Sequence, residues 1–221
     1  MVLQNRAKAT REAIIAGAAK VFEEHGYGTA SISLVAEAAQ VTKGALYFHF
    51  KSKDDLARAV LEAQHGVVVK AGEDILAGGG SSLSMMIRLC ASFGSQLATE
   101  PVVRAGIRLT LEASAFGQQV RDPYEDWTVT MTTLAEQGVR TGELRASLDP
   151  AALGHYIVAS FTGVQLVSNV LTGRADVMPR IRQMWEILLP GIMHEDSTED
   201  PEALAALVSK PLRRRRQAAS V

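Results

Sequence analysis

Apolar residues recur at spacings of three and four along most of the chain, a pattern that predicts amphipathic helices. The first predicted helix covers residues 7–25 and ends at Gly26, with an apolar face made of Ile14, Ile15, Ala18, Ala19, Val21 and Phe22. A second helix begins near Ser31 or Ser33, since either hydroxyl can cap it, and ends by Gln40. Its inner face is expected to carry Leu34, Val35 and Ala38.

A third short helix is predicted over residues 42–50 after a tight turn. Thr42 can cap it by accepting from a free N–H of the first turn. Leu46 and Phe50 lie four residues apart and can face inward together. Gly44 has no side chain to keep the backbone from an approaching surface, and the polar tips are Lys43, Tyr47 and His49. Helix, helix, turn and helix together indicate a helix-turn-helix.

A long helix follows, capped by Ser52, with two acids in its first turn. Its apolar stripe continues to the glycines at 78–80, which gives roughly 25 residues or about 37 Å. Such a rod can join two domains mechanically. Further helices are predicted at about 81–99, 101–116, 123–141, 150–172 and 176–193, with a short one at 203–208, and no convincing strand is found.

The predicted fold is therefore all-α, with an N-terminal three-helix DNA-binding domain and a C-terminal helical domain. The first domain is placed at residues 8–68, with the helix-turn-helix at about 31–50 and a linker helix from residue 53. The second domain is placed at 69–209 and a basic tail at 210–221. The last two long helices are apolar around more of their circumference than one packed face needs, which favours a homodimer.

The net charge of -1 conceals a basic–acidic–basic order along the chain. Residues 1–53 carry 7 Lys/Arg and 4 Asp/Glu, residues 54–209 carry 11 and 20, and residues 210–221 carry 5 and none. Phosphate attracts the basic N-terminal module and repels the acidic body, so charge alone would orient the molecule on a nucleic acid.

Other classes of protein find little support in the sequence. Residues 78–81 lack the Gly-Lys-Ser/Thr ending of a phosphate loop, and no hydrolase or metalloprotease motif is present. The five histidines are scattered and Cys90 is the single cysteine, so no metal site, disulfide or cofactor is predicted. The N-terminal residues are polar and no apolar run approaches a membrane span, which favours a cytoplasmic protein without membrane contact.

Residues 26–56 carry a resemblance to a known family. Gly26-Tyr27, the serine-rich entry to the second helix, residues 41–50 (VTKGALYFHF) and residues 53–56 (KDDL) stand where the TetR family of transcriptional regulators has its signature. Within that family, residues 42–50, residues 104–109 (RAGIRL) and Trp127 resemble the subgroup of receptors for γ-butyrolactone-type signalling molecules.

The resemblance implies an all-helical homodimer that binds a near-palindromic double-stranded DNA operator as a repressor. A small inducer of the γ-butyrolactone type, bound in the C-terminal domain, would release the operator. Control of secondary metabolism is what the subgroup implies. Two recognition helices must match major grooves roughly 34 Å apart, so a change in their separation weakens binding. The helix that begins at Lys53 is expected to transmit that change.

The DNA-contacting residues are predicted from the helix-turn-helix. Lys43 is assigned to base edges or phosphate, with Gly44 allowing close approach. Phosphate contacts are expected from Ser33, Thr42, Tyr47 and His49, and a clamp on the DNA backbone from Lys53.

The ligand residues are sought among polar groups on apolar faces, because a pocket for an amphiphile is mostly hydrophobic with a few orienting groups. Gln64 interrupts the stripe of the long helix, and Thr162 shares a face with Val158 and Gln165. Thr162 could instead bond back to its own helix. Trp127 offers a flat apolar wall with one N–H donor, and the resemblance associates this tryptophan with ligand binding.

Two alternatives remain open at this point. One is a TetR-like regulator of drug efflux that responds to lipophilic cations, although 5% aromatic residues is low for such a pocket. The other is a pseudo-receptor that binds DNA but answers antibiotics or other compounds instead of the signalling molecule.

Overall fold

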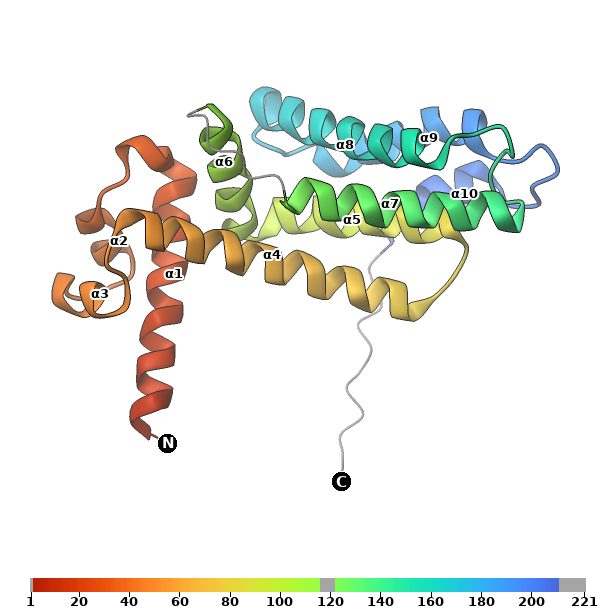
Figure 1. The fold of residues 1–221 in the computed structure, drawn as a ribbon. Coiled ribbons are helices and arrows are strands. Elements are labelled where there is room, and N and C mark those ends of the chain that lie inside the picture. Colours follow the sequence, from red (N-terminus) through yellow and green to blue (C-terminus); the bar gives the residue numbers. More distant parts are fainter. Residues whose placement is uncertain (1, 116–121, 211–221) are drawn as a thin grey trace. The chain divides into compact units, whose positions relative to one another are not determined.

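The computed structural model describes residues 2–115 and 122–210, and the predicted basic tail from 211 onward lies outside the described residues. Its elements are helical (Figure 1). They are α1 (Val2–Thr29), α2 (Ile32–Ala38), α3 (Lys43–His49), α4 (Lys53–Gly78), α5 (Ser82–Thr99), α6 (Pro101–Ala115), α7 (Asp122–Thr141), α8 (Pro150–Thr172), α9 (Val177–Ile192), α10 (Pro201–Ala205) and the 3₁₀ helix η1 (Ala206–Ser209). Outside these helices, the described part of the chain contains an isolated β-bridge between Leu144 and Met193.

Helix periodicity predicted these elements closely, and the all-α prediction is confirmed. The largest difference is at the start of α1, which begins at Val2 rather than near residue 7. Gly26 breaks α1 as predicted, because its φ of 72° and ψ of 174° are non-helical and a short turn of helix resumes after it. A second difference concerns α2, where Val35 and Ala36 are buried, whereas Leu34 and Ala38 are exposed. Of the expected inner face of α2, Val35 is confirmed, whereas Leu34 and Ala38 were wrong and Ala36 takes their place.

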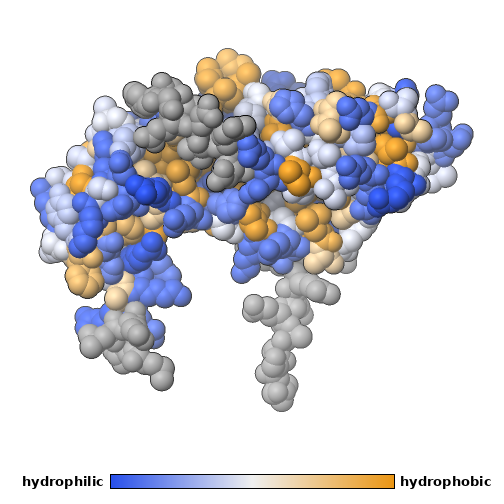
Figure 2. All heavy atoms as spheres, in the orientation of Figure 1, coloured by the Kyte–Doolittle hydropathy of each residue, from blue (hydrophilic) through white to orange (hydrophobic). Residues whose placement is uncertain are grey.

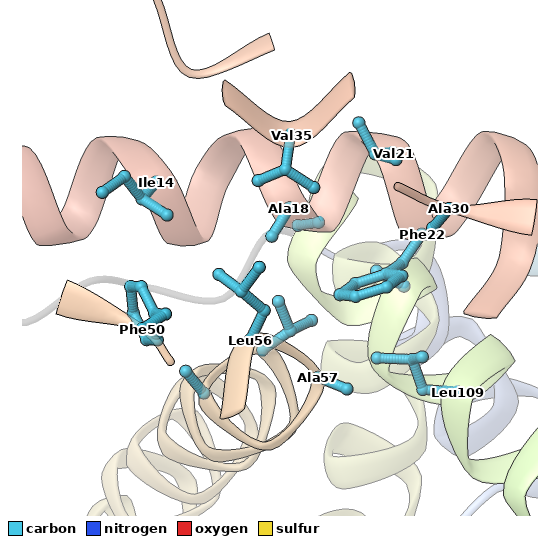
Figure 3. Close-up of a cluster of buried hydrophobic side chains, with 14 of the residues drawn as sticks. Ile14, Ala18, Val21, Phe22, Ala30, Val35, Phe50, Leu56, Ala57 and Leu109 are labelled. Carbon is cyan, nitrogen blue, oxygen red and sulfur yellow. The ribbon is translucent and has the colours of Figure 1, made fainter. Parts of the chain in front are cut away.

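The chain folds into two compact units, and the first contains residues 1–70 and 99–123. Its core is one cluster to which α1, α2, α3, α4 and α6 each contribute buried side chains, with Leu46 coming from α3. Figure 3 shows Phe22, Val35, Leu56 and Leu109 in this cluster. Close approach of α2 to α1 depends on Gly17, where a Cβ would lie 2.7 Å from the backbone nitrogen of Ala39. These contacts fix the helix-turn-helix against α1.

Among the described residues, the second unit contains 71–98 and 124–210. Helix α5 is its most enclosed element, since residues 82–94 are all buried except Arg88. Two glycines allow helices to approach closely. A Cβ at Gly94 would collide with Ile181 of α9, and a Cβ at Gly154 would lie 2.7 Å from the backbone nitrogen of Thr132. Helices α8 and α9 pack against each other after a left-handed turn at Gly173.

The two units differ from the contiguous domains 8–68 and 69–209 predicted from sequence, because α6 packs with the first unit. Ala105 and Leu109 of α6 are buried in the same cluster as Phe22 of α1. Periodicity shows that α6 is amphipathic but does not show which helix covers its apolar face. The chain thus leaves the second unit after Ala98, adds a helix to the first unit, and returns at Tyr124.

Candidate nucleic-acid interface and ligand region

Helix α3 is held by its apolar side and by a cap. The Thr42 hydroxyl accepts from the backbone N–H of Ala45 at 3.2 Å, as predicted. Leu46 is fully buried and Phe50, the C-cap residue, is 4% exposed, so the predicted inward pair is confirmed. Because α3 has seven residues, this fixed side determines which side chains face outward.

The outer face of α3 carries Lys43, Gly44 and Tyr47, all exposed, with Tyr47 at 48%. His49 is half-buried. Phe48 is 75% exposed and meets His49 edge-on, with ring centroids 5.2 Å apart. Phe48 was not among the predicted DNA-contacting residues, although a rotation of about 100° per residue puts it roughly opposite both Leu46 and Phe50. An exposed aromatic ring can contact thymine methyl groups.

Helix α2 is capped by Ser31, whose side chain accepts from the N–H of Leu34 at 3.2 Å. This observation decides between the two serines left open by the sequence. Ser33 is exposed and its hydroxyl does not serve as the cap. It therefore remains a candidate for a phosphate contact.

Lys53 has hydrogen-bond partners within the chain, and its clamp on the DNA backbone stays a prediction. Its ammonium donates to the carbonyls of Tyr27 at 2.8 Å, Ala30 at 3.2 Å and Gly28 at 3.4 Å, and lies 4.4 Å from the centroid of the Tyr27 ring. An ammonium has three hydrogens to donate, and here they are directed at these carbonyls. Lys53 thereby closes the end of α1, since these carbonyls have no helical partner.

The Tyr27 hydroxyl also ties α1 to the start of α4, because it donates to the carboxylate of Asp54. That hydrogen bond raises the pKa of Tyr27 to about 12, since ionisation would place a phenolate beside a carboxylate. The short segment after Gly26 is thus bound to α4 by Lys53 and Asp54 together.

Helix α6 binds the same segment through two charged side chains. Glu112 accepts from the backbone N–H of Tyr27 at 2.6 Å, and Arg108 donates to the carbonyl of Glu23 at 2.6 Å. Arg108 and Glu112 also pair with each other at 2.8 Å. A Cβ at Gly26 would collide with the Glu112 carboxylate. The sequence offered Gly26 only as a helix stop, so this junction between α1 and α6 was not foreseen.

In the second unit, three aromatic rings form one cluster. Trp127 of α7 meets Phe161 of α8 at 4.8 Å and Phe93 of α5 at 5.2 Å, both edge-on, and the two phenylalanines stack at 5.3 Å between centroids. Phe93 and Phe161 are buried, whereas Trp127 is half-buried. Trp127 therefore keeps one side available beyond the rings that support it.

The three α8 candidates have different surroundings. Val158 is buried and its carbonyl accepts from the Thr162 hydroxyl at 2.8 Å, so Thr162 bonds back to its own helix and can offer a ligand only its acceptor lone pairs. Gln165 is 2% exposed, and its Oε1 is buried with no hydrogen-bond partner in the described structure. A buried acceptor without a partner costs free energy, and a bound donor would remove that cost.

Gln64 belongs to the first unit, whereas the other four ligand candidates belong to the second. It is buried, and its side chain lies against Gly106 of α6, where a Cβ would be 2.6 Å from Cγ of Gln64. Gly106 thus leaves room for the Gln64 side chain between α4 and α6. Its role in ligand binding stays a prediction.

Cys90 is completely buried on α5, and burial raises the pKa of its thiol to about 12. Such a thiol is neutral and unreactive, which agrees with a small apolar core residue. Within the described ranges, no group of three or more histidine, cysteine, aspartate and glutamate side chains is arranged to hold a metal ion.

Helices α8 and α9 leave large apolar side chains exposed. The exposed residues are Tyr156, Leu166, Val167, Val170, Leu171 and Ile187, of which Ile187 is 81% exposed. Figure 2 shows hydrophobic surface over α8. Of the described helices, α8 is long and apolar enough to cross a membrane by length and composition, a test that core helices of soluble proteins also pass. The opposite side of α8 is buried, with Leu153, Ile157 and Phe161 in the core.

Comparison with known proteins places both parts of the chain in one family. Residues 14–60 match the family described as bacterial regulatory proteins, tetR family, and residues 80–194 match the Tetracyclin repressor-like C-terminal domain. The chain belongs to the TetR family. It is therefore a DNA-binding regulator of transcription rather than an enzyme, as the sequence predicted.

Individual relatives agree with this assignment. The A-factor receptor protein of Streptomyces griseus is 39% identical over 194 residues, covering 88% of this chain and 67% of the relative. A γ-butyrolactone receptor described as ArpA-like is 33% identical with a TM-score of 0.78, covering 92% of this chain and 98% of that one. CprB from Streptomyces coelicolor, solved with its operator, is 31% identical with a TM-score of 0.80, and the match covers 94% of this chain and 100% of CprB.

Proposed function

We propose that this TetR-family protein is a repressor that binds a near-palindromic operator as a homodimer and leaves it when a γ-butyrolactone-like molecule binds the second unit. The observation that carries the DNA part is α3, a short capped helix with Leu46 buried and Tyr47 and Phe48 exposed. The operator-bound relative CprB supports it. Since operator DNA lies in the cytoplasm, the protein works there, and we propose genes of secondary metabolism as its targets.

At the DNA, Lys43 contacts base edges or phosphate and Gly44 lets the helix approach closely. Tyr47, His49, Ser33 and Thr42 contact phosphates, and Phe48 adds an apolar contact to bases. Thr42 also caps α3, so its oxygen has a structural role as well. Phosphate contacts position the helix, and the base contacts of Lys43 and Phe48 provide the sequence preference.

The homodimer forms through the exposed apolar residues of α8 and α9. A monomer would leave Val170 and Leu171, both 74% exposed, in water, and a second copy covers them. An isologous interface relates the two α3 helices by a two-fold axis, which the half-sites of the operator must mirror.

The ligand lies against Trp127, with Phe93 and Phe161 as the supporting rings and Val158 as an apolar neighbour. Gln165 Oε1 is the polar group that orients it, because this buried acceptor has no hydrogen-bond partner within the described residues. A lactone ring with an alkyl substituent suits an aromatic wall, and a hydroxyl on the ligand suits the amide oxygen. The names of the A-factor and γ-butyrolactone receptors support this class of ligand.

Coupling between the ligand and the DNA passes through α6. The chain enters α6 from the second unit and returns to it afterwards, while Arg108 and Glu112 of α6 hold the backbone of α1 beside Gly26. Displacement of α6 would pull on α1, which carries α2 and α3. This route adds to the one predicted from the sequence through α4.

The test starts with a duplex that the purified protein selects from a random-sequence pool. A γ-butyrolactone with an alkyl side chain is then titrated into the complex, and fluorescence anisotropy follows release. We expect release at a lactone concentration that leaves an unrelated repressor on its own operator. Release by antibiotics but not by lactones would favour the pseudo-receptor, and failure to select any duplex would refute the repressor itself.

Tyr47→Ala tests the DNA-binding face separately. Its affinity for the selected duplex should fall about tenfold, the effect of losing roughly 1.4 kcal/mol from a charged or polar contact. Size-exclusion chromatography should show an unchanged dimer. Unchanged affinity in a gel-shift assay would count against the assignment.

A further inference from the structure

The first twelve residues of α1 extend beyond the core of the first unit. From residue 5 onward, where burial is described, Ile14 is the first buried residue of the helix, and residues 5–9 and 11–13 are exposed. Twelve helical residues span about 18 Å. Figure 1 shows this part of α1 continuing past α3, and we name residues 2–13 the arm.

Residues 5–13 of the arm have no apolar face to pack on a core. They contain three alanines and no larger apolar side chain. Their alanine, arginine, lysine and glutamate residues favour a helix, and the packed part of α1 removes the cost of nucleating it. This stretch is therefore a helix whose charged side chains face water.

The charge of the arm indicates what that surface is. Arg6, Lys8 and Arg11 fall within six residues, and Glu12 is the acid beside them. Lys8 reaches Glu12 at 3.9 Å, and the two side chains are 77% and 64% exposed. Such an exposed pair is worth little, so the ammonium remains available to another anion. Figure 2 shows mainly hydrophilic surface along this part of α1.

The position of the arm connects it with the proposed DNA-binding helix. The Arg11 guanidinium lies 5.2 Å from the centroid of the Phe50 ring, and Phe50 is the C-cap residue of α3. The arm therefore leaves the core beside the end of α3. Under the proposed function, a duplex bound to the exposed face of α3 would bring its sugar–phosphate backbone toward this edge.

We infer that the arm is a second DNA-contacting element, in which Arg6 and Lys8 bind phosphates of the duplex flanking the half-site bound by α3. This inference rests on the proposed function. Contacts to phosphate carry no sequence information, so the arm adds affinity for all duplexes and extends the covered length. It also accounts for a polar helix that continues beyond its own core.

The experiment compares the full-length protein with the double variant Arg6→Gln, Lys8→Gln. Lys20→Gln is the matched control, because Lys20 is exposed on the same helix but lies within the part packed on the core. The affinity of each protein is measured by anisotropy between 50 and 200 mM KCl, for example, on the selected duplex and on an unrelated duplex. Circular dichroism and the thermal midpoint verify that each variant folds.

We expect the slope of log Kd against log salt to fall by about 0.9 for each phosphate that the double variant no longer binds. The ratio of affinities for the two duplexes should stay the same, and Lys20→Gln should behave as the unmodified protein. An unchanged slope in the folded double variant would overturn the inference while leaving the repressor intact. A changed ratio would also overturn it, because the arm would then contact bases. Failure of the unmodified protein to select any duplex would refute the proposed function itself, a result distinct from an unchanged slope.

Discussion

The two regions proposed to carry function differ in where their polar groups lie. In α3, Lys43 and Tyr47 project into water from a helix whose other side is buried. In the second unit, Gln165 Oε1 is buried without a hydrogen-bond partner in the described structure. A surface that binds DNA can be complete before its partner arrives, whereas a buried acceptor is satisfied only when a donor enters. The absence of DNA should therefore cost the α3 region less stability than the absence of ligand costs the region around Gln165.

The largest effect is expected from Leu46→Ala, which attacks the packed side of α3. Removing a fully buried leucine costs roughly 2–5 kcal/mol, so the first unit should lose stability and operator binding together. Chemical denaturation followed by circular dichroism measures the loss. A variant of normal stability that fails to bind DNA would mean that Leu46 faces the duplex instead of the core.

Trp127→Ala should have the next largest effect, on the ligand side alone. Losing an aromatic wall is expected to raise the lactone concentration needed for release about 30-fold or more, while operator affinity stays unchanged. Val129→Ala is the control, because Val129 is 64% exposed on the same helix. Release of Trp127→Ala at the concentration that releases the unmodified protein would remove this residue from the proposed site.

Gln165→Leu tests whether the buried Gln165 Oε1 destabilises the protein when no ligand donates a hydrogen bond to it. Without ligand, the variant should be more stable by about 1 kcal/mol, because the buried acceptor is gone. Lactone should raise the melting temperature of the variant less than it raises that of the unmodified protein. Thermal melts with and without lactone measure both effects, and a variant that melts lower without ligand would show that Gln165 already has a stabilising partner.

Asp176→Asn should give the smallest effect, confined to the joint between α8 and α9. Hydrogen bonds from Ser168, Thr172 and Arg180 hold the pKa of Asp176 far below its usual range. A lowered folded pKa stabilises the protein above the unfolded value, about 3.9, and this stabilisation is lost as pH falls below it. The unmodified protein should therefore melt above the variant at pH 7, and the difference should narrow toward pH 3. A difference in melting temperature that stays the same from pH 7 to pH 3 would contradict a stabilisation that depends on the ionised Asp176.

Local signals in the sequence were sufficient for the DNA-binding region. A cap at Thr42 and an apolar pair four residues apart determine one face of α3, and helix periodicity then gives the other face. The predicted boundaries of α4 to α9 agree with the structure to within about a residue for the same reason. Lys53 shows the limit, since only the folded chain brings the carbonyls of Tyr27 and Ala30 to its ammonium.

The ligand region depends on contacts between distant segments. Trp127, Phe93 and Phe161 come from three helices, and no spacing in the sequence indicates that their rings meet. Gln64 was grouped with Trp127 because both interrupt or flank apolar stripes, yet it packs on Gly106 in the other unit. The junction of Glu112 with Tyr27 joins residues 85 positions apart and left no local pattern.

The most direct test of the account is the affinity of the lactone for the protein alone and for the protein already bound to its selected duplex. Coupling is reciprocal, so a ligand that weakens DNA binding by some factor must itself bind the DNA complex more weakly by the same factor. We expect calorimetric titrations to give a lactone Kd higher on the DNA complex by a factor of roughly 5 to 150. Equal affinities for the free and DNA-bound protein would contradict the claim that one region controls the other.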